Sequence, residues 1–209
     1  MNRAIKVRDL NKKISKIGIL GGSFDPIHNG HLNMALRSYE QYELDEVWLI
    51  PNGNAPHKDS DKMADATHRL AMCQLVADEY PFLKTCDIEV VSEEYSYTYI
   101  TVTKLQQMYP ENEFYFIMGA DSLDYFDKWR KPEIIASVCK ILVINRDEFS
   151  EDDMVDKIRR INAIFPAEIY IVHCPKVDVS STELRAKLDK ADVLSSVYEY
   201  ICDHDLYGN

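Results

Sequence analysis

Short apolar runs alternate with segments of helical spacing along most of the chain. Residues 16–22 (KIGILGG) form an apolar run that ends in two glycines, which predicts a buried strand followed by a tight turn. Residues 31–42 carry apolar side chains at helical spacing, so we expect a helix soon after that turn. The same patterns predict strands over 46–51, 84–91, 113–118, 140–145 and 168–173, and helices over 63–80, 99–108, 151–163, 181–189 and 192–203.

Apolar strands that alternate with helices are typical of a parallel sheet covered on both faces. The chain therefore predicts an α/β fold, a Rossmann-like doubly wound parallel sheet of five or six strands in a single domain over residues 16–209, preceded by a basic N-terminal extension over 1–15. No Gly/Ser-rich linker divides the chain. In such folds ligands bind beyond the carboxyl ends of the strands, so functional motifs should follow strands directly.

The charge balance limits the partners. Among 209 residues, 24 Lys and Arg against 35 Asp and Glu give a net charge of −11, while 46% of residues are hydrophobic. This composition excludes a disordered chain, and the acidic balance argues against a nucleic-acid partner. No apolar run approaches the roughly 20 residues of a membrane helix, so no membrane partner is expected. The five cysteines lie far apart and mostly in apolar stretches, which predicts buried free thiols and a cytoplasmic location.

The charge is also uneven along the chain. Residues 1–16 hold six basic residues and one acidic residue, a net charge of +5, so the remaining 193 residues carry −16. No apolar segment follows the basic start, as it would in a secretory signal. A phosphate-rich ligand would therefore have to be attracted by a few local groups rather than by the overall field.

A glycine-rich segment follows the first predicted strand. It reads GGSFDPIHNGHL over residues 21–32. Glycines let backbone N–H groups approach a ligand, and the helix start that follows has unpaired N–H groups suited to a phosphate. His28 and His31 lie three residues apart, hence on one face, where both can donate to phosphate oxygens. Two alternatives remain: the histidines could bind a metal, or they could only cap a turn.

A second segment late in the chain has a related character. It reads VSSTELR over residues 179–185. Ser181 or Thr182 would cap a helix there, and Arg185, one turn in, could form charge-assisted bonds to a phosphate. The H-x-G-H segment together with this S-S-T-x-x-R segment resembles the nucleotidyltransferase superfamily that is related in fold to class I aminoacyl-tRNA synthetases.

Within that superfamily, the sequence resembles the nicotinate-nucleotide adenylyltransferases of bacteria. The similarity runs from about Lys16 to Leu206 and rests on four segments: GGSFDPIHNGHL, PNGNAPHK at 51–58, SYT at 96–98, and GAD at 119–121 with Trp129 beyond it. Two positions depart from the family pattern. Ile100 stands where the family often has Asp, which removes a polar role there, and Ala55 replaces the first proline of P-P-H-K.

The resemblance implies an activity and a set of site residues. The phosphate of nicotinate mononucleotide would attack the α-phosphorus of ATP in line, without a covalent enzyme intermediate, giving deamido-NAD and pyrophosphate, with Mg²⁺ carried by ATP and no protein metal ligands. The implied catalytic residues are His28, His31, Lys58 and Arg185; the ATP-binding residues are Gly21, Gly22, Ser23, Phe24, Gly119, Asp121, Ser180, Ser181 and Thr182; the nicotinate-nucleotide-binding residues are Asn54, Tyr97, Thr98 and Trp129.

Other readings stay open at this point. Trp129 could be an ordinary core residue, Lys58 a solvated lysine and Asp121 only a helix cap. For the whole chain, the alternatives are a sister transferase acting on pantetheine phosphate or a polyol phosphate, a nucleotide sensor without turnover, and a metal-dependent hydrolase. The preference for the acid over the amide mononucleotide follows from the resemblance alone, and the sequence leaves open whether the chain forms a homo-oligomer.

Overall fold

A computed structural model describes residues 15–53, 63–92, 94–146 and 149–208 of the chain. Its described part contains one six-stranded sheet of order β3-β2-β1-β4-β5-β6, in which every neighbouring pair is parallel. The strands are β1 (Lys16–Gly22), β2 (Glu46–Pro51), β3 (Leu83–Thr85), β4 (Glu113–Gly119), β5 (Cys139–Asn145) and β6 (Ile169–His173). The doubly wound parallel fold expected from the sequence is confirmed.

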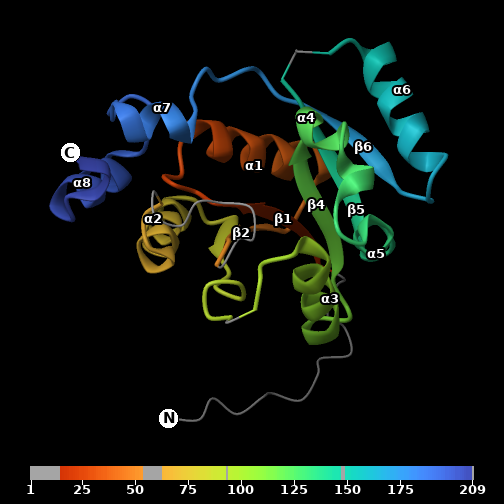
Figure 1. The fold of residues 1–209 in the computed structure, drawn as a ribbon, viewed down its shortest axis with the longest axis horizontal. Helices are drawn as coiled ribbons and strands as arrows, with labels where there is room; N and C mark the ends of the chain where they lie inside the picture. Colours follow the sequence, from red (N-terminus) through yellow and green to blue (C-terminus); the bar gives the residue numbers. More distant parts are fainter. Residues whose placement is uncertain (1–14, 54–62, 93, 147–148, 209) are drawn as a thin grey trace.

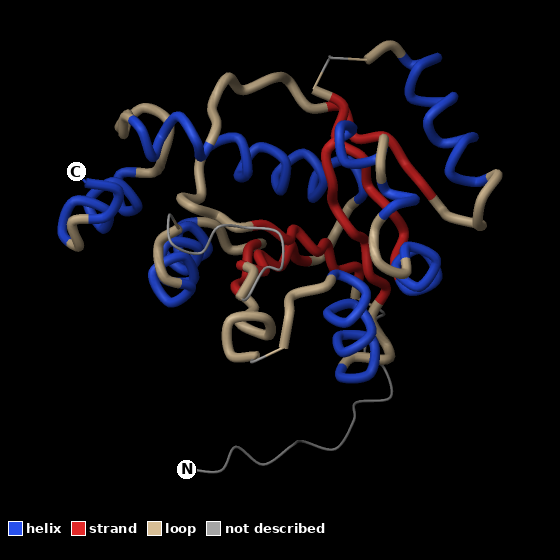
Figure 2. Tube along the Cα trace, viewed as in Figure 1, coloured by secondary structure: helices blue, strands red, loops and turns tan. Residues whose placement is uncertain are grey.

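Helices lie on both sides of the strands (Figures 1 and 2). They are α1 (Asn29–Tyr42), α2 (Ala66–Glu79), α3 (Thr98–Met108), α4 (Ala120–Leu123), α5 (Pro132–Val138), α6 (Glu151–Asn162), α7 (Ser181–Ala186) and α8 (Ser195–Asp203), with 3-10 turns η2 (Phe126–Lys128) and η3 (Leu206–Gly208). Helices α1, α2, α7 and α8 pack on one face of the sheet, and α3 to α6 pack on the other.

Alternating strand residues divide the core into two layers. In β4, Tyr115 and Ile117 join the layer under α1 and α2, whereas Phe114 and Phe116 join the layer under α3 and α5. Because successive side chains of a strand point to opposite faces, a strand that is apolar at nearly every position must be covered on both sides. This explains the continuous apolar runs of the sequence.

The structure corrects some boundaries. The strand predicted over 84–91 is wrong beyond Thr85, since β3 pairs with β2 over only three residues. The chain then turns, with the N–H of Val91 donating to the carbonyl of Asp87, and Ile88 packs on the core from this turn. The short helices α4 and α5 were not predicted. Strand β1 begins at Lys16; residues 1–14 of the predicted extension lie outside the described residues, so its boundary stays a prediction.

The side on which the chain adds new strands to the sheet changes between β1 and β4. From β1 the chain adds β2 and β3 on one side, and then crosses to β4 on the other. At such a switch point the loops leave the sheet in opposite directions, so a crevice opens beyond the carboxyl ends of the two strands. The segments after β1 and β4 are the ones in which the sequence places its motifs.

The cysteines agree with the expectation of free thiols. Cys73, Cys139 and Cys174 are buried, whereas Cys202 is exposed. None of the five forms a disulfide bond. Burial raises the pKa of the Cys73 and Cys139 thiols well above the ordinary range, so both stay protonated packing groups.

Candidate active site

The first motif forms a buried turn between β1 and α1. Phe24 adopts a left-handed backbone conformation (φ 48°), and the peptide bond between Asp25 and Pro26 is cis. Both Phe24 and Asp25 are buried, at 0% and 1% exposure. The turn brings His28 to the N-cap of α1, at the carboxyl edge of the sheet.

The two histidines of the motif present the same ring nitrogen. The Nδ1 atom of His28 accepts from the N–H of Gly30 at 3.1 Å, and Nδ1 of His31 accepts from the N–H of His28 at 3.3 Å. Because a neutral imidazole whose Nδ1 accepts carries its proton on Nε2, each ring is an Nε2–H donor. Their ring centroids are 3.8 Å apart. The site therefore holds two Nε2–H donors on neighbouring rings.

Gly30 is required by this arrangement. A Cβ atom at that position would lie 2.9 Å from Cε1 and 3.0 Å from Nδ1 of the His28 ring. Only a residue without a side chain lets the ring fold over the start of α1 and accept from the backbone. The glycine in H-x-G-H is thus explained by the position of the first histidine.

A cation that the sequence analysis missed lies beside His28. Burial, and secondly the positive charge of Arg146, lower the pKa of His28 to about 4. Arg146 follows β5 directly, and its Nη2 lies 3.3 Å from Sδ of Met34 in α1. A basic residue at the carboxyl end of a predicted strand is the signal that could have identified it. Near neutral pH, His28 is an uncharged donor next to a fixed positive charge.

The second motif is bonded to the first across the fold. Ser181 Oγ donates to the carbonyl of Pro26 at 3.1 Å, and Arg185 Nη1 donates to the carbonyl of Asp25 at 2.8 Å. Arg185 Nη1 also lies 3.5 Å from the Asp25 carboxylate. The structure thus brings together the two segments from which the family resemblance was inferred.

The cap of the second helix differs from the prediction. Ser180, not Ser181 or Thr182, is the N-cap of α7, and its hydroxyl accepts from the N–H of Glu183 at 3.2 Å. Ser181 is instead the first residue of α7, and its hydroxyl donates to the carbonyl of Pro26. Thr182 accepts a bond from Arg185 at 3.2 Å.

Arg69 of α2 is another residue that sequence reasoning missed, and it supports the loop after β1. It is 3% exposed, and its Nη1 donates to the carbonyl of Ser23 at 2.7 Å and to Oδ1 of Asn52 at 2.8 Å. Its Nε donates to the carbonyl of Ala64. A buried guanidinium needs such acceptors, and here they tie the ends of β1 and β2 together. Nothing in the helix pattern of α2 distinguishes it from a surface arginine.

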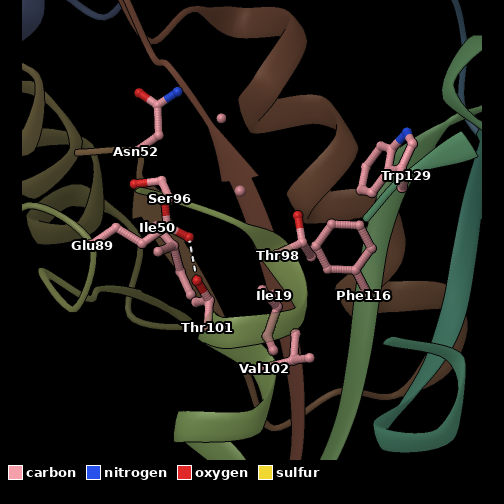
Figure 3. Close-up of a pocket in the computed structure, with 12 residues that line it drawn as sticks. Ile19, Ile50, Asn52, Glu89, Ser96, Thr98, Thr101, Val102, Phe116 and Trp129 are labelled. Atoms are coloured by element: carbon pink, nitrogen blue, oxygen red, sulfur yellow. Dashed lines mark hydrogen bonds between the residues drawn. The ribbon is translucent and has the colours of Figure 1, made fainter. Parts of the chain in front are cut away.

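A cavity of about 190 Å³ opens on the other side of the same edge (Figure 3). Its walls are mainly apolar side chains of the layer under α3, with a polar rim from the ends of β1 and β2 and from the start of α3. The lining residues are Ile19, Gly21, Gly22, Ile50, Asn52, Glu89, Ser96, Thr98, Thr101, Val102, Phe116 and Trp129.

Trp129 and Thr98, two of the residues predicted to bind the nicotinate nucleotide, lie in the wall of this cavity, and Tyr97 precedes Thr98 in the chain. The Trp129 ring contacts Phe116 and Phe126 edge-on, with centroids 6.0 and 5.5 Å away. Tyr97 is the N-cap of α3, and its ring lies 4.6 Å from the guanidinium carbon of Arg130. Trp129 is therefore held against the core by two aromatic rings and also lines the cavity.

Glu89 is a carboxyl group in the cavity wall that the sequence analysis did not identify. It accepts from Thr101 Oγ1 at 2.6 Å (Figure 3), and Ser96 also hydrogen-bonds to it. Burial raises the pKa of Glu89 above its ordinary value, against the effect of these two hydrogen bonds. Sequence reasoning missed Glu89 because it placed this residue inside the strand incorrectly predicted over 84–91.

The remaining predicted residues divide into two groups. Gly119 ends β4 next to β1, and the Asp121 carboxylate folds back over it, since a Cβ on Gly119 would lie 2.3 Å from Oδ1 of Asp121. Asn54 and Lys58 lie outside the described residues. Their proximity to the site stays a prediction.

The described residues contain neither a cluster of metal ligands nor a membrane-spanning helix. No group of three or more His, Cys, Asp or Glu side chains in this part of the chain could hold a metal ion. No described helix is long and apolar enough to cross a membrane.

A doubly wound sheet with two phosphate-type motifs joined at its switch point defines a nucleotidyltransferase-like protein. In agreement, a family model described as "Cytidylyltransferase-like" matches residues 19–187. Solved structures share the fold: a nicotinic acid mononucleotide adenylyltransferase of Plasmodium falciparum complexed with NaAD aligns with a TM-score of 0.75 and 23% identity, over 93% of this chain and 98% of the other.

Sequence relatives narrow the class. A protein of Shewanella pealeana described as "Probable nicotinate-nucleotide adenylyltransferase" is 39% identical over 92% of this chain and 95% of its own length. A protein of Lachnoclostridium phytofermentans with the same description is 34% identical over 92% of this chain and 98% of its own length. The chain belongs to the nicotinate-nucleotide adenylyltransferase family.

Proposed function

We propose that the protein transfers the adenylyl group of ATP to nicotinate mononucleotide, giving deamido-NAD and pyrophosphate. The observation that carries this proposal is the bonding of the second motif to the first, in which Ser181 and Arg185 donate to the carbonyls of Pro26 and Asp25. It brings the two histidine donors and a guanidinium to one edge of the sheet, beside a cavity with an aromatic wall. The donors suit the triphosphate of ATP, and the aromatic cavity suits the ring of the mononucleotide. The reaction requires these two environments next to each other.

The residues on the phosphate side suit displacement at phosphorus. The nucleophile is a phosphate that is already ionised near neutral pH, so no strong general base is needed, and positioning and charge neutralisation carry the catalysis. His28 and His31 donate from Nε2 to phosphate oxygens while the bond from the acceptor phosphate to the α-phosphorus forms, the bond to pyrophosphate breaks and negative charge builds up on the leaving pyrophosphate. Arg185 and Arg146 hold the triphosphate, and Lys58 joins them. The phosphate of the mononucleotide attacks the α-phosphorus directly, in line with the bond to the leaving pyrophosphate, so no covalent enzyme intermediate forms.

The residues on the cavity side suit the mononucleotide. Trp129 stacks on the nicotinate ring, and Thr98 at the start of α3 faces its carboxylate together with Tyr97. Gly21 and Gly22, the first two residues of the first motif, also line this cavity. Ser23 and Phe24 complete the phosphate-binding turn. Gly119 and Asp121 lie at the end of the neighbouring strand, where a ribose hydroxyl would be held.

Mg²⁺ would enter on the phosphates of ATP and neutralise part of their charge. We assign no side chain of the described residues to it, since none of their carboxylates form a cluster. The phosphate oxygens of ATP would hold the ion, and the histidines and arginines would bind the remaining phosphate oxygens.

The experiment is product analysis with ATP and one acceptor at a time. Nicotinate mononucleotide, nicotinamide mononucleotide, pantetheine phosphate and a polyol phosphate are each supplied with ATP and Mg²⁺, and pyrophosphate and the nucleotide product are measured. We expect deamido-NAD and one pyrophosphate per product with the first acceptor, and much slower turnover with the amide. Faster turnover with another acceptor, or tight ATP binding without turnover on any, would overturn the proposal.

A further inference from the structure

The last residues of the chain form a strained hook. After α8, Asp205, just before the 3-10 turn of residues 206–208, and Tyr207, within it, both have left-handed backbones, with φ values of 50° and 62°. A bulky residue such as tyrosine rarely adopts this conformation, and it persists only where the surrounding structure holds it. The C-terminal hook (residues 206–208) must therefore be fixed by contacts elsewhere in the fold.

The Tyr207 side chain supplies one such contact, and it leads into the first motif. Tyr207 Oη donates to Oδ1 of Asp25 at 2.8 Å, across 182 residues of sequence. The ring packs against the core layer under α1 and α2. Burial and the negative charge of Asp25 raise the pKa of the Tyr207 hydroxyl, so it stays a protonated donor.

Asp25 connects this tyrosine to the triphosphate side of the site. Its Oδ1 accepts from Tyr207 and from the N–H of Ala64, which follows the undescribed segment with Lys58. Its Oδ2 is buried without a hydrogen bond and faces Nη1 of Arg185 at 3.5 Å. The same Nη1 donates to the main-chain carbonyl of Asp25. Tyr207 and Ala64 both donate to Oδ1 and so fix the orientation of the carboxylate. That orientation sets the position of Oδ2, which faces Arg185.

We propose, resting on the proposed function, that Tyr207 is a positioning residue for adenylyl transfer: acting through Asp25, it sets the position of the Arg185 guanidinium that receives the triphosphate of ATP. The C-terminal hook then belongs to the support of the active site. Tyr207 touches no substrate itself. Loss of its hydroxyl should affect ATP, and leave the mononucleotide cavity on the other face of the sheet unchanged.

The first test compares Tyr207→Phe with Tyr200→Phe. Both variants lose one hydroxyl near the C-terminus, but Tyr200 bonds to His68 at 2.9 Å, away from the site. We expect Tyr207→Phe to raise the Kd and KM for ATP roughly tenfold, which lies within the range of coupling energies between members of one hydrogen-bond network. The KM for nicotinate mononucleotide should stay within about twofold, and Tyr200→Phe should match the wild type. Equal effects of both variants, or equal effects on both substrates, would overturn the inference.

A double-mutant cycle separates this inference from the proposed function. If Tyr207 acts through Arg185, then Tyr207→Phe should change the Kd for ATP by less than about twofold in an Arg185→Ala background. If Arg185→Ala alone leaves ATP binding unchanged, the triphosphate role of Arg185 is wrong, and the inference fails with it. If Arg185→Ala weakens ATP binding and Tyr207→Phe does not, the inference alone is wrong.

A second variant guards against a folding defect in Tyr207→Phe. Asp25→Asn keeps an acceptor for Tyr207 and Ala64 but removes the charge that faces Arg185. Thermal unfolding identifies the temperature range in which each variant is folded, and the Kd for ATP is measured there. We expect a selective loss of ATP affinity in Asp25→Asn, and unchanged affinity would contradict the proposed route through Asp25.

Discussion

The carboxyl edge of the sheet carries two regions of different construction, one over each face. The phosphate region (His28, His31, Ser181 and Arg185) lies over the face covered by α1 and α7, and its side chains are bonded to main-chain atoms of the first motif. The acceptor cavity lies over the other face, and residues of that core layer such as Ile19 and Phe116 form its walls. Hydrogen bonds to the main chain hold the side chains of the phosphate region, whereas packed side chains form the acceptor cavity.

This difference corresponds to two tasks. Groups that stabilise charge in a transition state must be held before the reaction begins, and bonds from the backbone hold His28 and His31 in one tautomer. A planar ring is bound by apolar surface and stacking, which side chains alone can supply. Substitutions of the two histidines should therefore lower kcat, and substitutions in the acceptor cavity should change the KM of the mononucleotide.

His31→Ala should give the largest effect. Loss of its Nε2 donor removes an interaction that strengthens as charge develops, so kcat should fall about 10²-fold or more while the KM values change little. Steady-state kinetics of the variant check this. The matched control is His173→Ala on the edge strand β6, which should keep wild-type kcat. A His31→Ala enzyme with wild-type turnover would contradict the division of tasks.

Trp129→Ala should give the converse pattern. Stacking of a base-like ring on an aromatic side chain contributes about 1–3 kcal/mol, so the KM for nicotinate mononucleotide should rise roughly 10- to 100-fold with little change for ATP. Trp129→Phe, which keeps a ring, should lie between. In a Trp48→Phe protein Trp129 is the sole tryptophan, and its fluorescence should change on adding the mononucleotide. A larger effect on ATP than on the mononucleotide would refute the stacking role.

The sequence predicted the phosphate region better than the acceptor cavity. The first motif and Arg185 follow local rules, in which glycines after an apolar strand and a Ser/Thr-rich helix start carry a visible signature. Five of the six strands were placed correctly because buried parallel strands are continuously apolar. Glu89 was missed because alternation over 84–91 reflects a turn packed on the core rather than a strand.

Other residues were missed for a different reason. Arg69 and Tyr207 reach the first motif only through tertiary contacts, and their own segments read as an ordinary helix and chain end. Arg146 had a readable position after β5, but its neighbour His28 is more than 100 residues away in sequence. Contacts of this range depend on which helices cover which face, and no local pattern encodes that order.

A smaller effect is expected on the acid stability of the phosphate region. The pKa of His28 is lowered to about 4 in the folded protein, against 6.5 in an unfolded chain. Between these values the unfolded chain binds more protons, so the free energy of unfolding falls as the pH drops from 6.5 towards 4. From pH 7.5 to pH 5 this amounts to about 2 kcal/mol. Urea unfolding at both pH values should show that His28→Gln loses less stability than the wild type. Equal losses would place the pKa of His28 near its ordinary value.

Glu89→Gln should give the smallest effect, and it tests whether the acceptor cavity also uses charge. Glutamine keeps an acceptor for Thr101 and removes a charge that opposes the carboxylate of the mononucleotide. We expect the KM for nicotinate mononucleotide to fall roughly two- to threefold while that for the amide stays the same. The exposed Glu94, paired with Lys104, supplies the control Glu94→Gln.

Stability provides an independent readout of the same carboxyl group. The pKa of Glu89 is raised by burial, so its contribution to the free energy of unfolding is present at low pH and is lost as the pH rises through the folded-state pKa. Glu89→Gln should therefore be the more stable protein above neutral pH, and the difference should shrink towards pH 4. If the acid-to-amide KM ratio moves without this pH-dependent gain, the glutamine changes the shape of the cavity, and charge is not what Glu89 contributes to it.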